Sequence, residues 1–386
     1  MSENMKPSLP IYLDYNATTP VAPEVLTAML PYLGEHFGNP SSSHPYGIRA
    51  RQAVMQAREA VAALIGTQPD EVIFTGSATE ANNLALLGAA RVAGPGKRHL
   101  VVSAIEHPAV MAPAEYMKTL GWEVTTLPVD GYGRVDPEDL RRALRPDTFM
   151  VSVMHANNEI GTVQPVAELA EIARSHGCLI HTDAAQSAGK IALDVDALGV
   201  DLLTLAGHKF YAPKGVGALY VRHGTPLAGI LHGAEQEHGL RPGTENVPHI
   251  VALGAAATLA DGRLNEAVMR MKAARDALHT QLAEGVPELV LNGHSEFRLP
   301  NTLHVSFPHV TGRTLLAEAA AVVAASVGSA CHSEGDTVSG VLAAMGIDTA
   351  RAAGAIRLST GWATTLQDIE RAADALIVAW RRLAHQ

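Results

Sequence analysis

Short apolar runs alternate with polar or glycine-containing turns through the first two thirds of the chain. The runs lie at residues 71–74, 100–103, 148–154, 178–180 and 202–205. Their length and their turn boundaries predict buried strands. Helical patterns lie between them, for example at 78–90 and at 165–176, where Gly177 predicts the stop. Alternation of strand and helix across residues 72–221 predicts a mainly parallel sheet with helices on both faces.

Further elements are predicted along the rest of the chain, and those at its two ends are assigned to a second, smaller unit. A short strand that runs into a loop is expected at 11–20, and further strands at 298–307 and 355–359. Further helices are expected at 21–33, 136–144, 247–282, 314–325, 338–345 and 366–384. The glycine, proline and serines of 37–44 predict a turn. We therefore expect an α/β protein: residues 16–260 form a large domain with a mainly parallel sheet, and residues 1–15 and 261–386 form a smaller α+β domain.

Composition restricts the class of protein. The 386 residues are 47% apolar and 18% charged, which is typical of a globular protein with a sizeable core. A net charge of −10 without a dense basic run argues against nucleic acid as a partner. Residues 1–10 lack the apolar core of a signal peptide, and no apolar run is long enough to cross a membrane. We expect a cytoplasmic protein without membrane contact, and we assign no metal site.

Two predicted strands end in residues with recognisable chemistry. Asp183 follows the run at 178–180, and His208 and Lys209 follow the run at 202–205. Parallel strands bring such ends to one sheet edge, where open α/β sheets bind ligands. A lysine that forms a Schiff base and an acid that holds a pyridinium nitrogen are the usual contributions of a protein to pyridoxal phosphate chemistry. Taken singly, Asp183 is more often a cap and Lys209 a surface charge, so the pair carries the prediction.

Three further segments fit this chemistry. Ser77 and Glu80 have the spacing of a capping box, so the loop after residues 71–74 opens onto a helix N-terminus that suits a phosphate. Cys331 lies in a loop of small residues, where a reactive thiol is expected, whereas Cys178 lies in an apolar run and is most simply a buried hydrophobe. Arg357, in a predicted strand, is a candidate clamp for a carboxylate, with a buried salt bridge as the alternative.

Together these segments resemble the cysteine desulfurase and selenocysteine lyase family, which belongs to the class V aminotransferase group of fold type I pyridoxal-phosphate enzymes. The likeness runs from Tyr12 to about Thr365. It implies a homodimer whose pyridoxal 5′-phosphate is held by Ala78, Thr79, His107, Asn158, Asp183, Gln186, His208 and Lys209, and by Thr244 from the other subunit. It also implies that Lys209, His107 and Cys331 are catalytic and that Asn39 binds the substrate together with Arg357. For Asn39, a role in shaping the turn is an equal alternative.

The resemblance implies removal of sulfur from L-cysteine, giving L-alanine and a persulfide on Cys331 that passes to an acceptor such as an iron–sulfur scaffold protein. Strings at 181–186, 241–246, 298–302 and 326–333 look nearer to selenocysteine lyases, so cleavage of L-selenocysteine to alanine and selenide is the second reading. Less favoured are an aminotransferase, which needs no Cys331, and an inactive assembly scaffold, which needs no Lys209.

The chain departs from the family pattern at three places. Ala206 replaces a serine that gives many relatives a phosphate contact, so cofactor affinity is expected to be lower. Gly361 is followed by Trp362 where many relatives have arginine. Family members commonly have Ser-Gly where this chain has Gly76 and Ser77. This exchange leaves the backbone N–H donors of the following helix in place.

Overall fold

The computed structural model describes residues 9–328 and 339–384, and its largest element is a seven-stranded sheet in the order β2-β8-β7-β6-β5-β3-β4. The strands are β2 (Val72–Thr75), β3 (His99–Ser103), β4 (Glu123–Leu127), β5 (Thr148–Ser152), β6 (Leu179–Asp183), β7 (Leu202–Ala206) and β8 (Gly217–Val221). Only β8 runs antiparallel to its neighbours in this sheet. The predicted mainly parallel sheet is confirmed.

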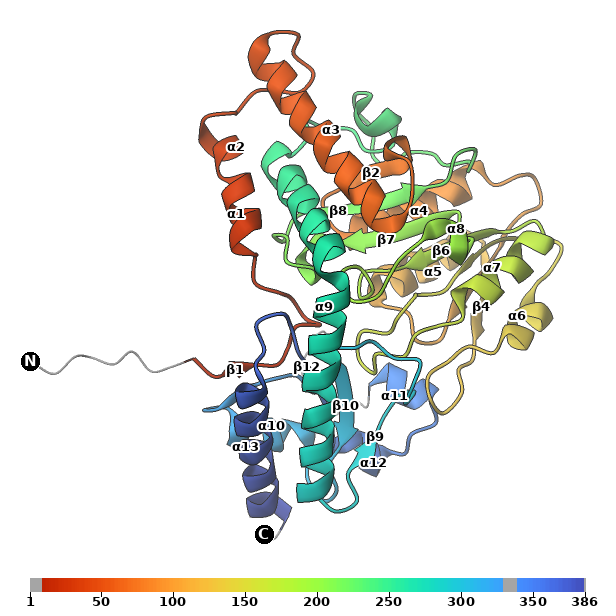
Figure 1. Ribbon diagram of the computed structural model, residues 1–386. Helices are drawn as coiled ribbons and strands as arrows, with labels where there is room; N and C mark the ends of the chain where they lie inside the picture. The colour runs from red at the N-terminus through yellow and green to blue at the C-terminus, as the bar shows by residue number, and fades with distance from the viewer. Residues whose placement is uncertain (1–8, 329–338, 385–386) are drawn as a thin grey trace, which may run out of the picture.

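Helices cover both faces of the sheet (Figure 1). They are α3 (Pro45–Ile65), α6 (Pro137–Ala143), α7 (Val166–Ser175) and α9 (Val247–Gly285) on one face, and α4 (Ala78–Val92) and α5 (Pro108–Thr119) on the other. Successive residues of a strand point to opposite faces. Val101 of β3 accordingly joins the core under α3, α7 and α9, whereas Leu100 and Val102 join the core under α4 and α5.

A second core is built from both ends of the chain. It surrounds an antiparallel sheet of β9 (Val290–Leu291), β10 (Thr302–Ser306) and β12 (Ala355–Ser359), with a parallel pair of β1 (Ile11–Tyr12) and β11 (Val323–Ala324), and helices α10 (Gly312–Ala319) and α13 (Leu366–Ala384). Helix α9 belongs to both cores, because Leu253 is buried in the first and Leu278 in the second. The domain boundaries proposed above stay a prediction.

Shorter elements complete the chain. They are α1 (Pro23–Met29), α2 (Pro31–Gly34), α8 (Val195–Leu198), α11 (Gly340–Ala344), α12 (Thr349–Ala353) and the 3₁₀ turns η1 (Pro69–Glu71), η2 (Gly207–Lys209) and η3 (Gln236–Gly239). The helix predicted at 314–325 is wrong at its end, because Val323 and Ala324 form β11 beside β1. The helix predicted at 21–33 is divided at Pro31, which has no N–H to donate. Across the described residues, none of the helices combines the length and apolar character needed to span a bilayer.

Candidate active site

A cavity of about 450 Å³ lies at the carboxyl edge of the large sheet. Its walls come from the segments that follow β2, β3, β5, β6 and β7, from Asn16 and Ala17 near the N-terminus, and from Val341 in α11 and Arg357 in β12. Parts of the chain that are far apart in sequence therefore meet around one space. This is the edge at which open α/β sheets bind their ligands.

Most of the predicted site residues line this cavity: Ala78, Thr79, His107, Asn158, Asp183, Gln186, His208, Lys209 and Arg357. Asn39 does not, since it is exposed and its Oδ1 accepts the Ser41 N–H at 2.9 Å, which is the turn-shaping alternative. Thr244 is also exposed and lies outside this cavity. Cys331 lies outside the described residues.

Asp183, the last residue of β6, is held by two donors. The Asn82 side-chain amide donates to its Oδ2 at 2.7 Å, and the Ala185 N–H donates to its Oδ1 at 2.9 Å. The carboxylate is 6% exposed and borders the cavity. A buried carboxylate fixed in this way is a suitable partner for a protonated ring nitrogen. Asn82 escaped the sequence analysis because its polar side chain lies within the helix after Ser77.

Lys209 comes at the end of η2, the single turn that follows β7. Its Nζ donates to the main-chain oxygens of Asn16 at 2.6 Å and Ala17 at 2.8 Å. The amine is therefore held at the cavity wall instead of extending into solvent. The alternative of an ordinary surface lysine does not describe this position.

His107 caps the N-terminus of α5, and its Nδ1 accepts the Ala109 N–H at 3.1 Å. Burial lowers the pKa of His107, although the Asp183 carboxylate opposes this change. The ring is therefore neutral at neutral pH. Because Nδ1 acts as the acceptor, the proton of the neutral ring is on Nε2.

The start of α4 has the features of an anion site. Ser77 Oγ accepts the Glu80 N–H at 3.1 Å, as the capping-box spacing predicted, but Glu80 Oε2 accepts the N–H of Gly76 at 2.8 Å instead of that of Ser77. The N–H groups of Ala78 and Thr79 have no carbonyl partner within the helix and lie beside the cavity. Arg241 pairs with Glu80 at 2.9 Å, which offsets a negative charge next to this site.

His208 also lines the cavity. Its Nδ1 is 3.2 Å from the Thr18 Oγ1. Burial and the nearby positive charge of Lys209 lower the pKa of His208 to about 4, so its imidazole is neutral. A neutral ring can donate one hydrogen bond to a phosphate oxygen without adding charge. Ala206 also borders the cavity and brings no polar group.

Arg357 combines the two roles that the sequence left open. Its guanidinium is buried, with one terminal nitrogen 2.7 Å from Asp14 Oδ1 and the other donating to the Asn158 main-chain oxygen at 3.0 Å. The salt-bridge alternative is thus present. Arg357 nevertheless lines the cavity, where its remaining N–H groups can meet a carboxylate.

Glu106 is a cavity residue that the sequence analysis did not single out. Its Oε1 accepts hydrogen bonds from Ser103 Oγ at 2.5 Å and from the Met154 N–H at 2.8 Å. Burial raises the pKa of Glu106 to about 8, and the Asp183 carboxylate acts in the same direction. The side chain is therefore mostly protonated at neutral pH. Its place directly before His107 after an apolar strand was the available signal.

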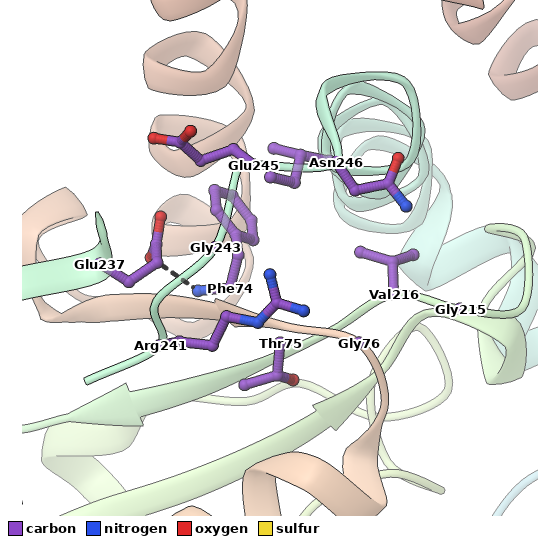
Figure 2. A pocket seen from close by; sticks show the side chains of 11 residues that line it. Phe74, Thr75, Gly76, Gly215, Val216, Glu237, Arg241, Gly243, Glu245 and Asn246 are labelled. Carbon is purple, nitrogen blue, oxygen red and sulfur yellow. Dashed lines mark hydrogen bonds between the residues drawn. The ribbon is translucent and has the colours of Figure 1, made fainter. Parts of the chain in front are cut away.

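The glycine-rich segment 232–246 packs against its own chain around a small pocket of about 40 Å³. Figure 2 shows Arg241 extending its guanidinium into this pocket and Glu237 accepting the Phe74 N–H, a contact of 2.8 Å. Glu237 also binds both terminal nitrogens of Arg58. The exposed Thr244 belongs to the same segment.

Comparisons with known proteins agree with this geometry. The class-V aminotransferase family matches residues 11–372. The cysteine desulfurase IscS of Dictyoglomus turgidum is 45% identical over 95% of this chain and 93% of its own length, and that of Anaeromyxobacter dehalogenans is 46% identical over 94% and 91%. A solved NifS-like protein superposes with a TM-score of 0.91 at 38% identity, covering 97% of this chain and all of its own. A structure described as SspA in complex with cysteine has a TM-score of 0.82 at 36% identity, covering 91% and 98%.

Proposed function

The chain belongs to the class-V aminotransferase family, and we infer that it is a cysteine desulfurase, which removes sulfur from L-cysteine and leaves L-alanine. The observation that carries this inference is the cavity that joins Lys209 and Asp183 beside the open end of α4. Relatives at 43–46% identity over nearly the whole chain are named cysteine desulfurases, which favours this activity over the selenocysteine lyase reading.

We propose pyridoxal 5′-phosphate as the cofactor. When bound, it supplies a carbonyl carbon that links to an amine and a ring that accepts the electron pair released at the substrate α-carbon. Asp183 would hold the ring nitrogen, Asn158 and Gln186 would lie near the phenolic oxygen, and the phosphate would meet the N–H groups at the start of α4 and His208. The buried carboxylate, the unpaired helix N–H groups and the cavity volume fit these parts.

The protein groups then have separate tasks. Arg357 would bind the carboxylate of the substrate, and Lys209 would remove the proton from its α-carbon. His107 would stack on the ring and donate from Nε2, the nitrogen that carries its proton in the neutral form.

Cys331, as a thiolate, would attack the sulfur of the substrate. A sulfur–sulfur bond forms while the carbon–sulfur bond breaks, and the electron pair left on carbon takes up a proton, which yields alanine and a persulfide. We further propose a cytoplasmic homodimer in which Thr244 serves the site of the other subunit. The persulfide would pass to an acceptor such as an iron–sulfur scaffold protein.

Alanine release from L-cysteine and from L-selenocysteine tests the proposed function. We expect the purified protein with pyridoxal phosphate to form alanine from cysteine, and we expect Cys331→Ser to lose this activity while retaining bound cofactor. Cys178→Ser is the matched control, since Cys178 is buried with its Sγ 3.4 Å from the Thr148 oxygen. Unchanged activity in Cys331→Ser would contradict the persulfide step, and turnover of selenocysteine alone would identify a lyase.

A further inference from the structure

A buried lysine, Lys190, contacts two residues of the cavity wall, Asn16 and Gln186. Lys190 is 4% exposed, and its Nζ donates to Gln186 Oε1 at 2.7 Å and to Asn16 Oδ1 at 3.1 Å. Burial and the cations of Lys209 and Arg357 lower the pKa of Lys190 well below its ordinary value. Two of the N–H groups of Lys190 therefore have an acceptor on a buried side chain.

The side chain of Asn16 connects Lys190 to both cores. Its Oδ1 accepts from Lys190 and, at 3.0 Å, from Asn301. Its Nδ2 donates to Thr302 Oγ1 at 2.8 Å and to the Asn158 main-chain oxygen at 3.1 Å. Asn16 is 1% exposed, so each contact is shielded from water and its loss would leave a buried polar group without a partner.

The main chain of Asn16 accepts a hydrogen bond from the catalytic lysine. Its carbonyl oxygen accepts from Lys209 Nζ at 2.6 Å and from Gln186 Nε2 at 3.0 Å, while its N–H donates to Ser359 Oγ at 3.0 Å. Any rotation of the Asn16 peptide would therefore move the acceptor that holds the Lys209 amine. The contacts of the Asn16 side chain oppose this rotation.

Lys190 also fixes the orientation of the Gln186 amide. The oxygen of this amide is occupied by Lys190, and one of its two N–H groups is occupied by the Asn16 carbonyl. The group that Gln186 can present to the cavity is then the second N–H, a donor. Without Lys190, the amide would lose the contact that distinguishes its oxygen end from its nitrogen end.

We propose that Lys190 is a positioning residue which, through the Asn16 side chain and the Gln186 amide, sets where the Lys209 amine stands before the cofactor binds. The inference rests on the proposed function, because it concerns uptake of pyridoxal phosphate at Lys209. It differs from a purely structural role, in which Lys190 would stabilise the fold without affecting the cofactor.

Lys190→Met tests the proposal, because methionine has a similar shape and no donor. Lys97→Met is the control: Lys97 donates to the Thr148 oxygen at 2.9 Å near the opposite end of the sheet. The measurements are the dissociation constant of pyridoxal phosphate, from visible absorbance of the titrated apoprotein, and the thermal midpoint of the apoprotein. We expect about tenfold weaker cofactor binding in Lys190→Met, the effect of a lost buried hydrogen bond, and wild-type binding in the control. A lower thermal midpoint with unchanged cofactor binding would overturn the positioning role.

Asn16→Ala and the double variant Lys190→Met/Asn16→Ala test whether Lys190 acts through the Asn16 side chain. If Lys190 acts through Asn16, the double variant loses less affinity than the product of the two single losses, whereas a full product overturns that route. Asn301→Ala, which removes another donor to Asn16 Oδ1, should weaken cofactor binding even if Lys190→Met fails to fold, and unchanged binding there would also count against the proposal. A wild-type protein that takes up no cofactor overturns the proposed function as well, while normal wild-type uptake with an unaffected Lys190→Met overturns this inference alone.

Discussion

The carboxyl group of Glu106 is buried where a negative charge is disfavoured. Its titration should therefore change the free energy of unfolding with pH. The pKa is raised to about 8 in the folded protein from an ordinary value of 4.5. Between these values the folded state keeps a proton that the unfolded chain has lost, and the free energy of unfolding therefore falls as pH rises. Glu106→Gln keeps an oxygen for the Ser103 and Met154 donors and removes the titration.

We expect the free energy of unfolding of Glu106→Gln, relative to wild type, to rise between about pH 5 and about pH 9 in urea titrations of the apoprotein. Glu171→Gln, at an exposed position of α7, is the matched control for the loss of one carboxyl group. A difference between Glu106→Gln and wild type that stays constant with pH would show that Glu106 is ionised at neutral pH.

Ala206 offers a gain-of-affinity prediction. It lines the cavity at the end of β7. In the family pattern described above, many members have a serine at this position. Ala206→Ser should add a hydroxyl contact to the cofactor phosphate, and a hydrogen bond to a charged group contributes about 1.5–3 kcal/mol. Equilibrium titration with pyridoxal phosphate should therefore give a smaller dissociation constant than for wild type. An equal or larger constant would mean that the phosphate does not lie against residue 206.

Single residues were predictable where strand ends fixed their position. Asp183 and Lys209 follow apolar runs, so the sheet alone brings them together. Asn16 and Lys190 could not be found in this way, because their burial depends on contacts with the second core and with the turn after β6. Asn39 had equal local support for two roles, and the single chain shows only its turn contact.

Helix α9 provides a test at the scale of elements. An added Cβ at Gly254 would lie 2.5 Å from Ala57 Cα in α3, which is closer than atoms can pack. At Gly262, eight residues later in the same helix, an added Cβ meets nothing within 4 Å. The close crossing of α3 and α9 thus requires glycine at the first position and not at the second.

Gly254→Ala should lower the free energy of unfolding by about 1–3 kcal/mol through overpacking. Gly262→Ala should raise it by about 0.5–1 kcal/mol, because alanine is the better helix former. Denaturant unfolding of both variants gives the comparison. Equal effects of the two substitutions would contradict the packing of α3 on α9.

Elements with a long uniform pattern were predicted well, and elements set by distant partners were not. The predicted helix 247–282 is α9, and 366–384 is α13. The helical pattern of 314–325 was misleading at its end, since β11 exists because β1 offers it a pairing edge. No element was predicted at α3, which packs as a long helix against α9.

At the scale of the whole molecule, the proposed dimer makes a prediction about shared sites. Thr244 is exposed and outside the cavity of its own chain. If it contacts the phosphate of the other subunit, Thr244→Ala should weaken cofactor binding in every site of its homodimer. Mixing it with Lys209→Ala should create hybrids with one intact site, about a quarter of all sites. Cofactor stoichiometry after subunit exchange measures this. No recovery in the mixture would mean that Thr244 and Lys209 of the same subunit serve one site, which contradicts the shared site.

Lys209 is proposed to carry the cofactor in the cavity at the sheet edge, and the assigned roles of the other site residues depend on this. Borohydride reduction of the protein with pyridoxal phosphate, followed by mass spectrometry of its peptides, shows which lysine is linked to the cofactor. We expect a stable adduct on the peptide that contains Lys209 and none in a folded Lys209→Ala variant. An adduct confined to another lysine, or no adduct on the wild-type protein, would contradict it.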